Sequence, residues 1–203
     1  MTLNNYQADN PYPHIERYRM LSLIIGGVLL LACIPGWIFA PKSFYPAYLF
    51  AWIFWLGVSL GSIAIVMLHH QTGGEWGVFV RRIGEAAGMV VPLLLLLFIP
   101  LFFGMKVLYP WHPRNPGYIN LFVQHRTPWF NPLLWSIRWG ITLIVFILMA
   151  GLLRSLSLSH DREPRVGKLE RMRIFSGPGL VIYFVLMSLA AVDWILSREP
   201  ESR

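Results

Sequence analysis

Five apolar runs, each about twenty residues long, constrain this chain more than any other feature. They cover residues 20–39, 47–68, 86–108, 132–153 and 179–196. A helix of about 20 residues crosses the hydrocarbon core of a bilayer, whereas a soluble domain of 203 residues could not bury five such runs. The ten-residue alternation typical of an outer-membrane barrel is absent. We therefore predict an all-α integral membrane protein with five transmembrane helices.

Composition and charge agree with this class. The chain is 56% hydrophobic and 13% charged, and its formal net charge is +7. We exclude nucleic-acid binding, because the basic residues lie between the apolar runs, where Lys and Arg set the orientation of a membrane protein. A single cysteine, Cys33, excludes an internal disulfide and a four-cysteine iron–sulfur cluster.

The distribution of basic residues predicts the topology. Ten Lys and Arg residues lie on the side of the N-terminus and six lie on the other side. This asymmetry predicts a cytoplasmic segment over residues 1–19, a transmembrane domain over residues 20–203 and a periplasmic C-terminus. The connection at residues 109–132 is expected to form a packed cap, and the charged connection at 154–178 a solvated loop.

Tryptophan repeats the asymmetry. Five indoles cluster near the predicted outer ends of the spans: Trp37, Trp111, Trp129, Trp135 and Trp194. Trp and Tyr are enriched where a membrane meets water. We expect these residues to form an aromatic belt at the outer interface.

A charged, glycine-broken stretch, "HHQTGGEWGVFVRRIGEAAG", separates the second and third runs. Gly73 and Gly74 are expected to end one helix and turn the chain. Arg81 and Arg82 precede Glu85 by four and three residues, so either can reach it on one helix. Two interpretations of this group stay open: an interfacial ion pair, and a proton-entry group at the mouth of the third span.

The histidines offer no clear ligand set. His69 and His70 are adjacent, so they point about 100° apart on a helix and cannot clamp one metal ion. Hydrogen bonding at the membrane interface is their expected role. All six histidines fall in loops or at span ends, so we expect this chain to bind no haem and no metal. No phosphate-binding loop, dinucleotide fingerprint or nucleophile elbow occurs.

Two Gly-x-x-x-Gly pairs have the spacing of close helix packing, Gly57 with Gly61 and Gly84 with Gly88. The motif is common in apolar helices, so each pair has either a packing role or no special role. Pro92 and Pro100 lie inside the third run and are expected to kink it.

Arg138 and Asp193 are the only charges clearly inside the apolar runs. Counting about 1.5 Å per residue, both lie roughly 6–9 Å below the outer ends of their spans. We predict an ion pair that joins the fourth span to the fifth. The alternative is that each side chain reaches the interface independently.

Three stretches together resemble a known family. They are "WLGVSLGSIAIVMLHHQTGGEWGVFVRRIGEAA", "VPLLLLLFIPLFFGMKVLYPW" and "SGPGLVIYFVLMSLAAVDWILS". They resemble the ActF membrane subunits of bacterial alternative complex III, within the NrfD-like (polysulfide-reductase membrane subunit) family. The resemblance implies ten spans, with spans 2–5 and 6–9 forming two four-helix bundles and span 1 peripheral. This chain would correspond to the N-terminal half, as a fragment, a split gene product or a truncated form.

The resemblance implies a membrane subunit of a quinol-oxidising respiratory complex in the bacterial inner membrane. Its partners would be other membrane subunits, an iron–sulfur subunit and multihaem cytochrome c subunits, which would carry the clusters and haem c. A quinol site in a sister subunit uses a histidine and an aspartate. The matching regions here read "PLFFGMKVL" and "WSIRWG", with Arg138 near the expected aspartate, so a complete quinol site is not expected. The chain would not be catalytic alone.

Two other functions stay open from the sequence. One is half of a secondary transporter built from inverted five-helix repeats around a site at the bilayer midplane. That function would require a broken helix with polar residues at mid-bilayer. Only the two prolines of the third run indicate such a break, and no mid-span charge accompanies them. The other is an inert truncated fragment.

Overall fold

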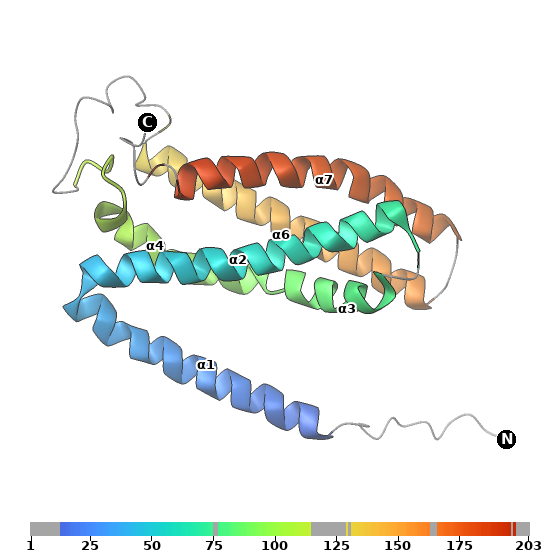
Figure 1. Cartoon of the computed structure of the whole chain (residues 1–203), viewed down its shortest axis with the longest axis horizontal. Coiled ribbons are helices and arrows are strands. Elements are labelled where there is room, and N and C mark those ends of the chain that lie inside the picture. The colour runs from blue at the N-terminus through green and yellow to red at the C-terminus, as the bar shows by residue number, and fades with distance from the viewer. Residues whose placement is uncertain are drawn as a thin grey trace. The chain divides into compact units, whose positions relative to one another are not determined.

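The computed structural model describes residues 13–74, 77–114, 129, 131–162, 166–195 and 197. This part of the chain contains helices and no strand (Figure 1). The helices are α1 (Pro13–Phe39), α2 (Pro41–Thr72), α3 (Gly77–Gly88), α4 (Val91–Leu108), α6 (Pro132–Arg162) and α7 (Val166–Trp194).

Five helical stretches are long and apolar enough to cross a membrane, and the third of them combines α3 with α4. Their bounds are Glu16–Phe39, Pro41–Thr72, Val80–Leu108, Pro132–His160 and Leu169–Trp194. Each predicted apolar run overlaps one of these stretches. The predicted all-α membrane fold with five spanning helices is therefore confirmed.

The connection at residues 154–178 differs from the prediction of a solvated loop. α6 continues as far as Arg162, and α7 already begins at Val166. The segment is rich in Leu, Arg, Lys and Glu, which favour helix, and a helix does not have to end where the hydrocarbon ends. The apolar runs therefore mark only the central parts of longer helices.

The third span is interrupted at Met89 and Val90, just before Pro92, the first of the two prolines expected to kink it. α3 ends at Gly88, and Met89 and Val90 form a turn before α4 begins. The amide of Val90 bonds to the carbonyl of Ala87 at 3.1 Å, which tightens this turn. Pro92 follows in the first turn of α4, where its missing N–H costs nothing. Pro100 lies inside α4 without ending it.

The chain divides into two compact units, residues 1–44 and 45–203. The first unit holds α1, whose apolar window has no buried residue among those described. At the end of α1 the amide of Ala40 donates to the carbonyl of Gly36 at 3.0 Å. A uniformly apolar, exposed helix of this kind suits contact with lipid.

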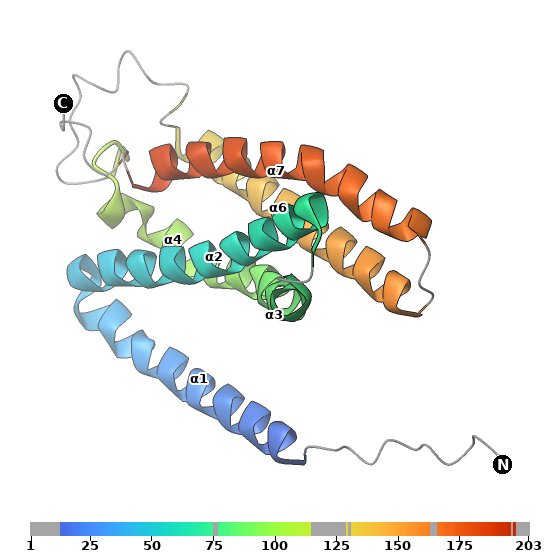
Figure 2. The ribbon, with the colours of Figure 1, turned by 45° about the vertical axis from the view of Figure 1, so that its right-hand side comes forward.

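The second unit holds the other helices. α2, α4, α6 and α7 run side by side in both views (Figures 1 and 2), and α6 contacts α3, α4 and α7. α2 is joined to α4 by two side chains, Trp52, whose Nε1 donates to Leu94 O at 2.9 Å, and Tyr48. The indole N–H and the phenol O–H donate to backbone carbonyls, because the hydrocarbon core of a membrane offers no water as a partner.

Candidate functional site

The stretch between α2 and α3 turns back on itself through glycine. The amide of Gly73 donates to His69 O at 2.8 Å, and Gly73 and Gly74 have φ angles of +66° and +89°. Glycine adopts these angles without the clash that a Cβ would cause, so the predicted turn is confirmed. At Gly77 a Cβ would meet the ring of His69, so a larger residue at the start of α3 would require His69 to move.

The Gly84–Gly88 pair lets α3 approach α2 closely. A Cβ on Gly84 would lie 2.7 Å from Val66 and 3.2 Å from the backbone carbonyl of Ser62. A Cβ on Gly88 would lie 2.7 Å from Ile63. The packing role considered for this pair is therefore confirmed.

The Gly57–Gly61 pair behaves differently. A Cβ at either position would meet nothing within 4 Å among the described atoms. Within the described part of the chain the pair has no packing role, although it has the same spacing. Spacing alone therefore did not distinguish a packed glycine pair from an unpacked one.

Glu85 lies beside this close contact, with its side chain only 5% exposed. Its Oε2 is 3.2 Å from Arg82 Nη1, and its Oε1 is 3.6 Å from Arg81 Nε. One carboxylate therefore faces two guanidinium groups, and the cluster keeps a net positive charge. The predicted proximity of these three residues is confirmed, and all three lie on α3.

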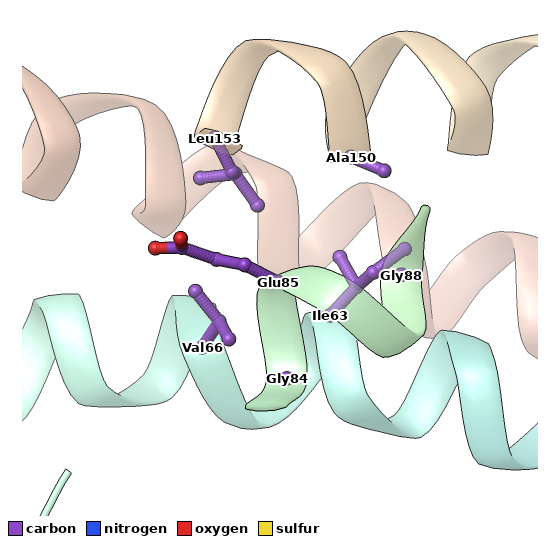
Figure 3. Close-up of a pocket in the computed structure, with 7 residues that line it drawn as sticks. All are labelled: Ile63, Val66, Gly84, Glu85, Gly88, Ala150 and Leu153. Carbon is purple, nitrogen blue, oxygen red and sulfur yellow. The ribbon is translucent and has the colours of Figure 1, made fainter. Parts of the chain in front are cut away.

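Figure 3 shows Glu85 passing between Val66 of α2 and Leu153 of α6. A cavity of about 10 Å³ adjoins it, and its lining includes Ile63 and Ala150. That volume is about the size of one water molecule. Glu85 thus lies where the polar end of the helices meets their apolar interior.

α2 also meets α7 at this end. His70 Nδ1 is 3.0 Å from Ser176 Oγ, and Gln71 Nε2 donates to the carbonyl of Arg173. α7 accommodates α2 through small residues, since a Cβ on Gly177 would lie 3.3 Å from Gln71 Nε2. The "SGPG" stretch, residues 176–179, is therefore the contact surface for the end of α2.

A hollow of about 540 Å³ opens at the same place, where α2 ends and α7 begins (Figure 1). It is lined by His69, His70, Gly73, Gly74, Arg81, Leu169, Glu170, Met172 and Arg173. Histidine and arginine side chains dominate its polar lining. His70 makes a hydrogen bond, but its partner Ser176 is buried between α2 and α7.

The second charged cluster lies near the C-terminal end of α7. Arg138 Nε is 2.6 Å from Asp193 Oδ2, and Arg138 Nη2 is 3.0 Å from Asp193 Oδ1. Asp193 is 1% exposed, so this two-point pair is buried on the carboxylate side. The ion pair predicted between these two residues is confirmed, and it joins α6 to α7.

Trp129 completes this cluster, which we call the Arg138–Asp193 clamp. Its Nε1 donates to Asp193 Oδ1 at 2.9 Å, and its ring lies 4.1 Å from Arg138 Cζ. An indole can stack on a guanidinium and donate to its carboxylate partner at the same time. The sequence had indicated only an interfacial position for Trp129, so this role was missed.

The predicted aromatic belt is wrong for three of its members. Trp111, Trp135 and Trp194 are 2%, 1% and 4% exposed, so they belong to the core. Trp194 lies 3.6 Å from Trp139 and 4.6 Å from Trp52, measured between ring centroids. The depth along a span had been inferred correctly, but the side of the helix that faces its neighbours was not visible in the sequence.

His112 lies at the same end, beyond the last residue of α4. Its Nδ1 accepts the amide N–H of Arg114 at 3.1 Å. Partial burial, with Arg114 and Lys106 nearby, lowers the pKa of His112 below its usual value. The imidazole is therefore neutral near pH 7.

Among the described residues, no three His, Cys, Asp or Glu side chains come close enough to hold a metal ion. His125 and most of the predicted cap lie outside the described residues, as does Trp76. The structure thus offers two charged clusters at opposite ends of the second unit, and the larger hollow lies at the Glu85 end. Comparison with known protein families and with curated protein sequences finds no matching family model and no matching sequence.

Proposed function

We propose that this chain is a membrane subunit of a quinol-oxidising respiratory complex of the alternative complex III type, in the bacterial inner membrane. In this role it is a scaffold and a carrier of protons rather than a catalyst. The observation that supports this most is the contact between the stretches that carry the family resemblance. His70, from the first stretch, meets Ser176, the first residue of the last stretch, and the neighbouring Gln71 meets Arg173, three residues before that stretch.

The scaffold role rests on the two ends of the helices. Close packing at Gly84 joins α3 to α2, and the Arg138–Asp193 clamp joins α6 to α7. In the proposed complex Arg138 serves this clamp instead of a quinol. Partner subunits would hold the quinol, the iron–sulfur clusters and haem c.

The proton-carrying role rests on Glu85. A buried ionisable group at a span boundary is a candidate member of a proton path. Glu85 has two guanidinium neighbours toward one side and a water-sized cavity toward the apolar interior. Proton entry from the arginine side would make use of this geometry.

The direct test is purification of the tagged chain from its native membranes under mild detergent. We expect an iron–sulfur subunit and multihaem cytochrome c subunits to co-purify. After these partners are stripped, the chain should show no haem b Soret change in a reduced-minus-oxidised spectrum. Recovery of the chain without redox partners, or with haem of its own, would overturn the proposal.

The proton role has a separate test. In the assembled complex, Glu85→Gln should leave assembly unchanged and reduce proton-coupled quinol oxidation. Arg154→Gln is a suitable control, because Arg154 is an exposed cation of α6 outside this cluster. Normal proton coupling in Glu85→Gln would leave only the scaffold role.

A transporter half is the second candidate, and one observation favours it. The third span is interrupted at Met89 and Val90, four residues after Glu85. Secondary transporters use broken helices of this kind, with the break near the bilayer midplane, whereas this break lies near one end of the apolar run. Solute uptake by liposomes that contain only this chain would favour this candidate, whereas co-purification with redox subunits would exclude it.

A further inference from the structure

The hollow between the end of α2 and the start of α7 has the composition of an anion site. Among the described residues its charged lining side chains are Arg81, Arg173 and Glu170, and His69 and His70 add two imidazoles. In this described lining the two arginines outnumber the one carboxylate. Because a guanidinium group donates several hydrogen bonds in a plane, arginine is well suited to binding phosphate.

Glu85 offsets part of the charge of Arg81, so Arg173 is the main cation of the hollow. The carboxylate of Glu85 is shared between Arg81 and Arg82, at 3.6 Å and 3.2 Å. Arg173 is the more accessible cation of the hollow, since it is exposed on α7. The backbone at Arg173 is also held in place, because its carbonyl accepts a hydrogen bond from Gln71.

The hollow lies beyond the ends of two apolar runs, on the side where lipid headgroups are expected. The run 47–68 ends one residue before His69, and the run 179–196 begins six residues after Arg173. Lipid phosphates lie where the hydrocarbon core ends. A cationic hollow at this level therefore meets phosphates from the bilayer itself.

Apolar surface continues from the hollow into the spans. Leu169 lines the hollow and is half exposed. Leu68 on α2 and Phe175 on α7 are also about half exposed. Acyl chains could lie against these side chains while the headgroup occupies the hollow, an arrangement that a free phosphate ion would not use.

We propose that this hollow binds the phosphate of an anionic phospholipid, with Arg173 as its main contact. Basic pockets between transmembrane helices are suited to anionic headgroups. The site needs no partner subunit, because α2, α3 and α7 of this chain supply its lining. The bound lipid would bridge the end of α2 to the start of α7.

The test uses the purified full chain in a neutral detergent, with the thermal unfolding midpoint measured during lipid titration. Phosphatidylglycerol should raise the midpoint, whereas phosphatidylcholine and inorganic phosphate should not. Arg173→Gln should weaken the apparent affinity for phosphatidylglycerol about tenfold, the loss expected for one charge-assisted contact. Arg171→Gln should leave it unchanged, because Arg171 is exposed on the same helix outside the hollow.

Three results would overturn the proposal. Equal stabilisation by phosphatidylglycerol and phosphatidylcholine would show that charge is not recognised. Equal weakening in the Arg171 and Arg173 variants would show diffuse attraction without a site. A full response to inorganic phosphate would make the ligand a free anion. If Arg173→Gln is unstable before lipid is added, Arg173→Lys replaces it. This variant keeps the charge and should keep most of the response to phosphatidylglycerol. A complete loss of that response in Arg173→Lys would also contradict the proposal.

Discussion

The two charged clusters use the same chemistry in different ways. At one end Glu85 pairs with Arg81 and Arg82 of its own helix, at 3.6 Å and 3.2 Å. At the other end Arg138 and Asp193 come from different helices and pair at 2.6 Å. The first cluster can form as soon as α3 forms, whereas the second exists only when α6 and α7 are packed.

The two clusters are separated by most of the length of a span. On α2, His70 contacts α7 at one end, and Trp52 contacts Trp194 at the other. The eighteen residues between them correspond to about 27 Å of helix, close to the thickness of the hydrocarbon core. The same helices therefore carry a hollow at one polar end and a buried ion pair at the other.

The largest difference expected between the two clusters is that they face opposite sides of the membrane. We expect a reporter that is active only in the periplasm to be active when fused after Arg203 and silent when fused after Lys168. The reason is the excess of basic residues on the N-terminal side. The reverse pattern would invert the orientation, and two silent fusions would contradict the odd number of crossings.

The clamp should be the more costly cluster to break. Asp193→Ala leaves Arg138 and the indole N–H of Trp129 without their carboxylate, at an expected cost of about 3–5 kcal/mol. The double variant with Arg138→Ala should lose less than the sum of the two single variants. Reversible unfolding in mixed micelles measures these losses. Additive losses would mean that the two residues act independently.

The glycine pairs offer a matched test of packing. Gly84→Ala places a Cβ 2.7 Å from Val66 and 3.2 Å from the carbonyl of Ser62, so we expect a loss of about 1–3 kcal/mol. Gly57→Ala meets nothing within 4 Å and should be neutral or slightly stabilising, since alanine favours helix. Equal effects of the two substitutions on unfolding in mixed micelles would contradict the packing difference.

The smallest expected effect is at Arg82. Its side chain is 46% exposed, and Arg81 also faces Glu85, so Arg82→Gln should cost at most about 1 kcal/mol. Added salt should reduce this cost further. A loss as large as that of Asp193→Ala would mean that the local cluster is as structurally demanding as the clamp.

Much of this fold was predictable because membrane insertion depends on local hydropathy. The five spans, the turn at Gly73 and Gly74, and the reach from Arg82 to Glu85 depend on neighbouring residues along the chain. The Arg138–Asp193 pair was also predictable, although it is a tertiary contact. Few charges lie inside the spans, and counting residues from the span ends placed these two at the same depth.

Features that depend on which side of a helix packs against its neighbours were not predictable. Trp194 was expected at the lipid interface and lies in the core, because the side of a helix that meets its neighbours is set by packing. Gly57 and Gly84 share one motif, and only the second lies against another helix. The pairing of His70 with Ser176, 106 positions apart, likewise has no local signal.

The amino-acid sequence therefore established the class of this protein and its five apolar helices, since both follow from the transfer of short segments into lipid. The tertiary structure decided which glycines pack, which indoles are buried and where α2 meets α7 to form the hollow. The physical reason is that lipid can solvate any apolar face of a helix, so hydropathy does not distinguish one face from another. Only close contact with a particular neighbour distinguishes one face from another.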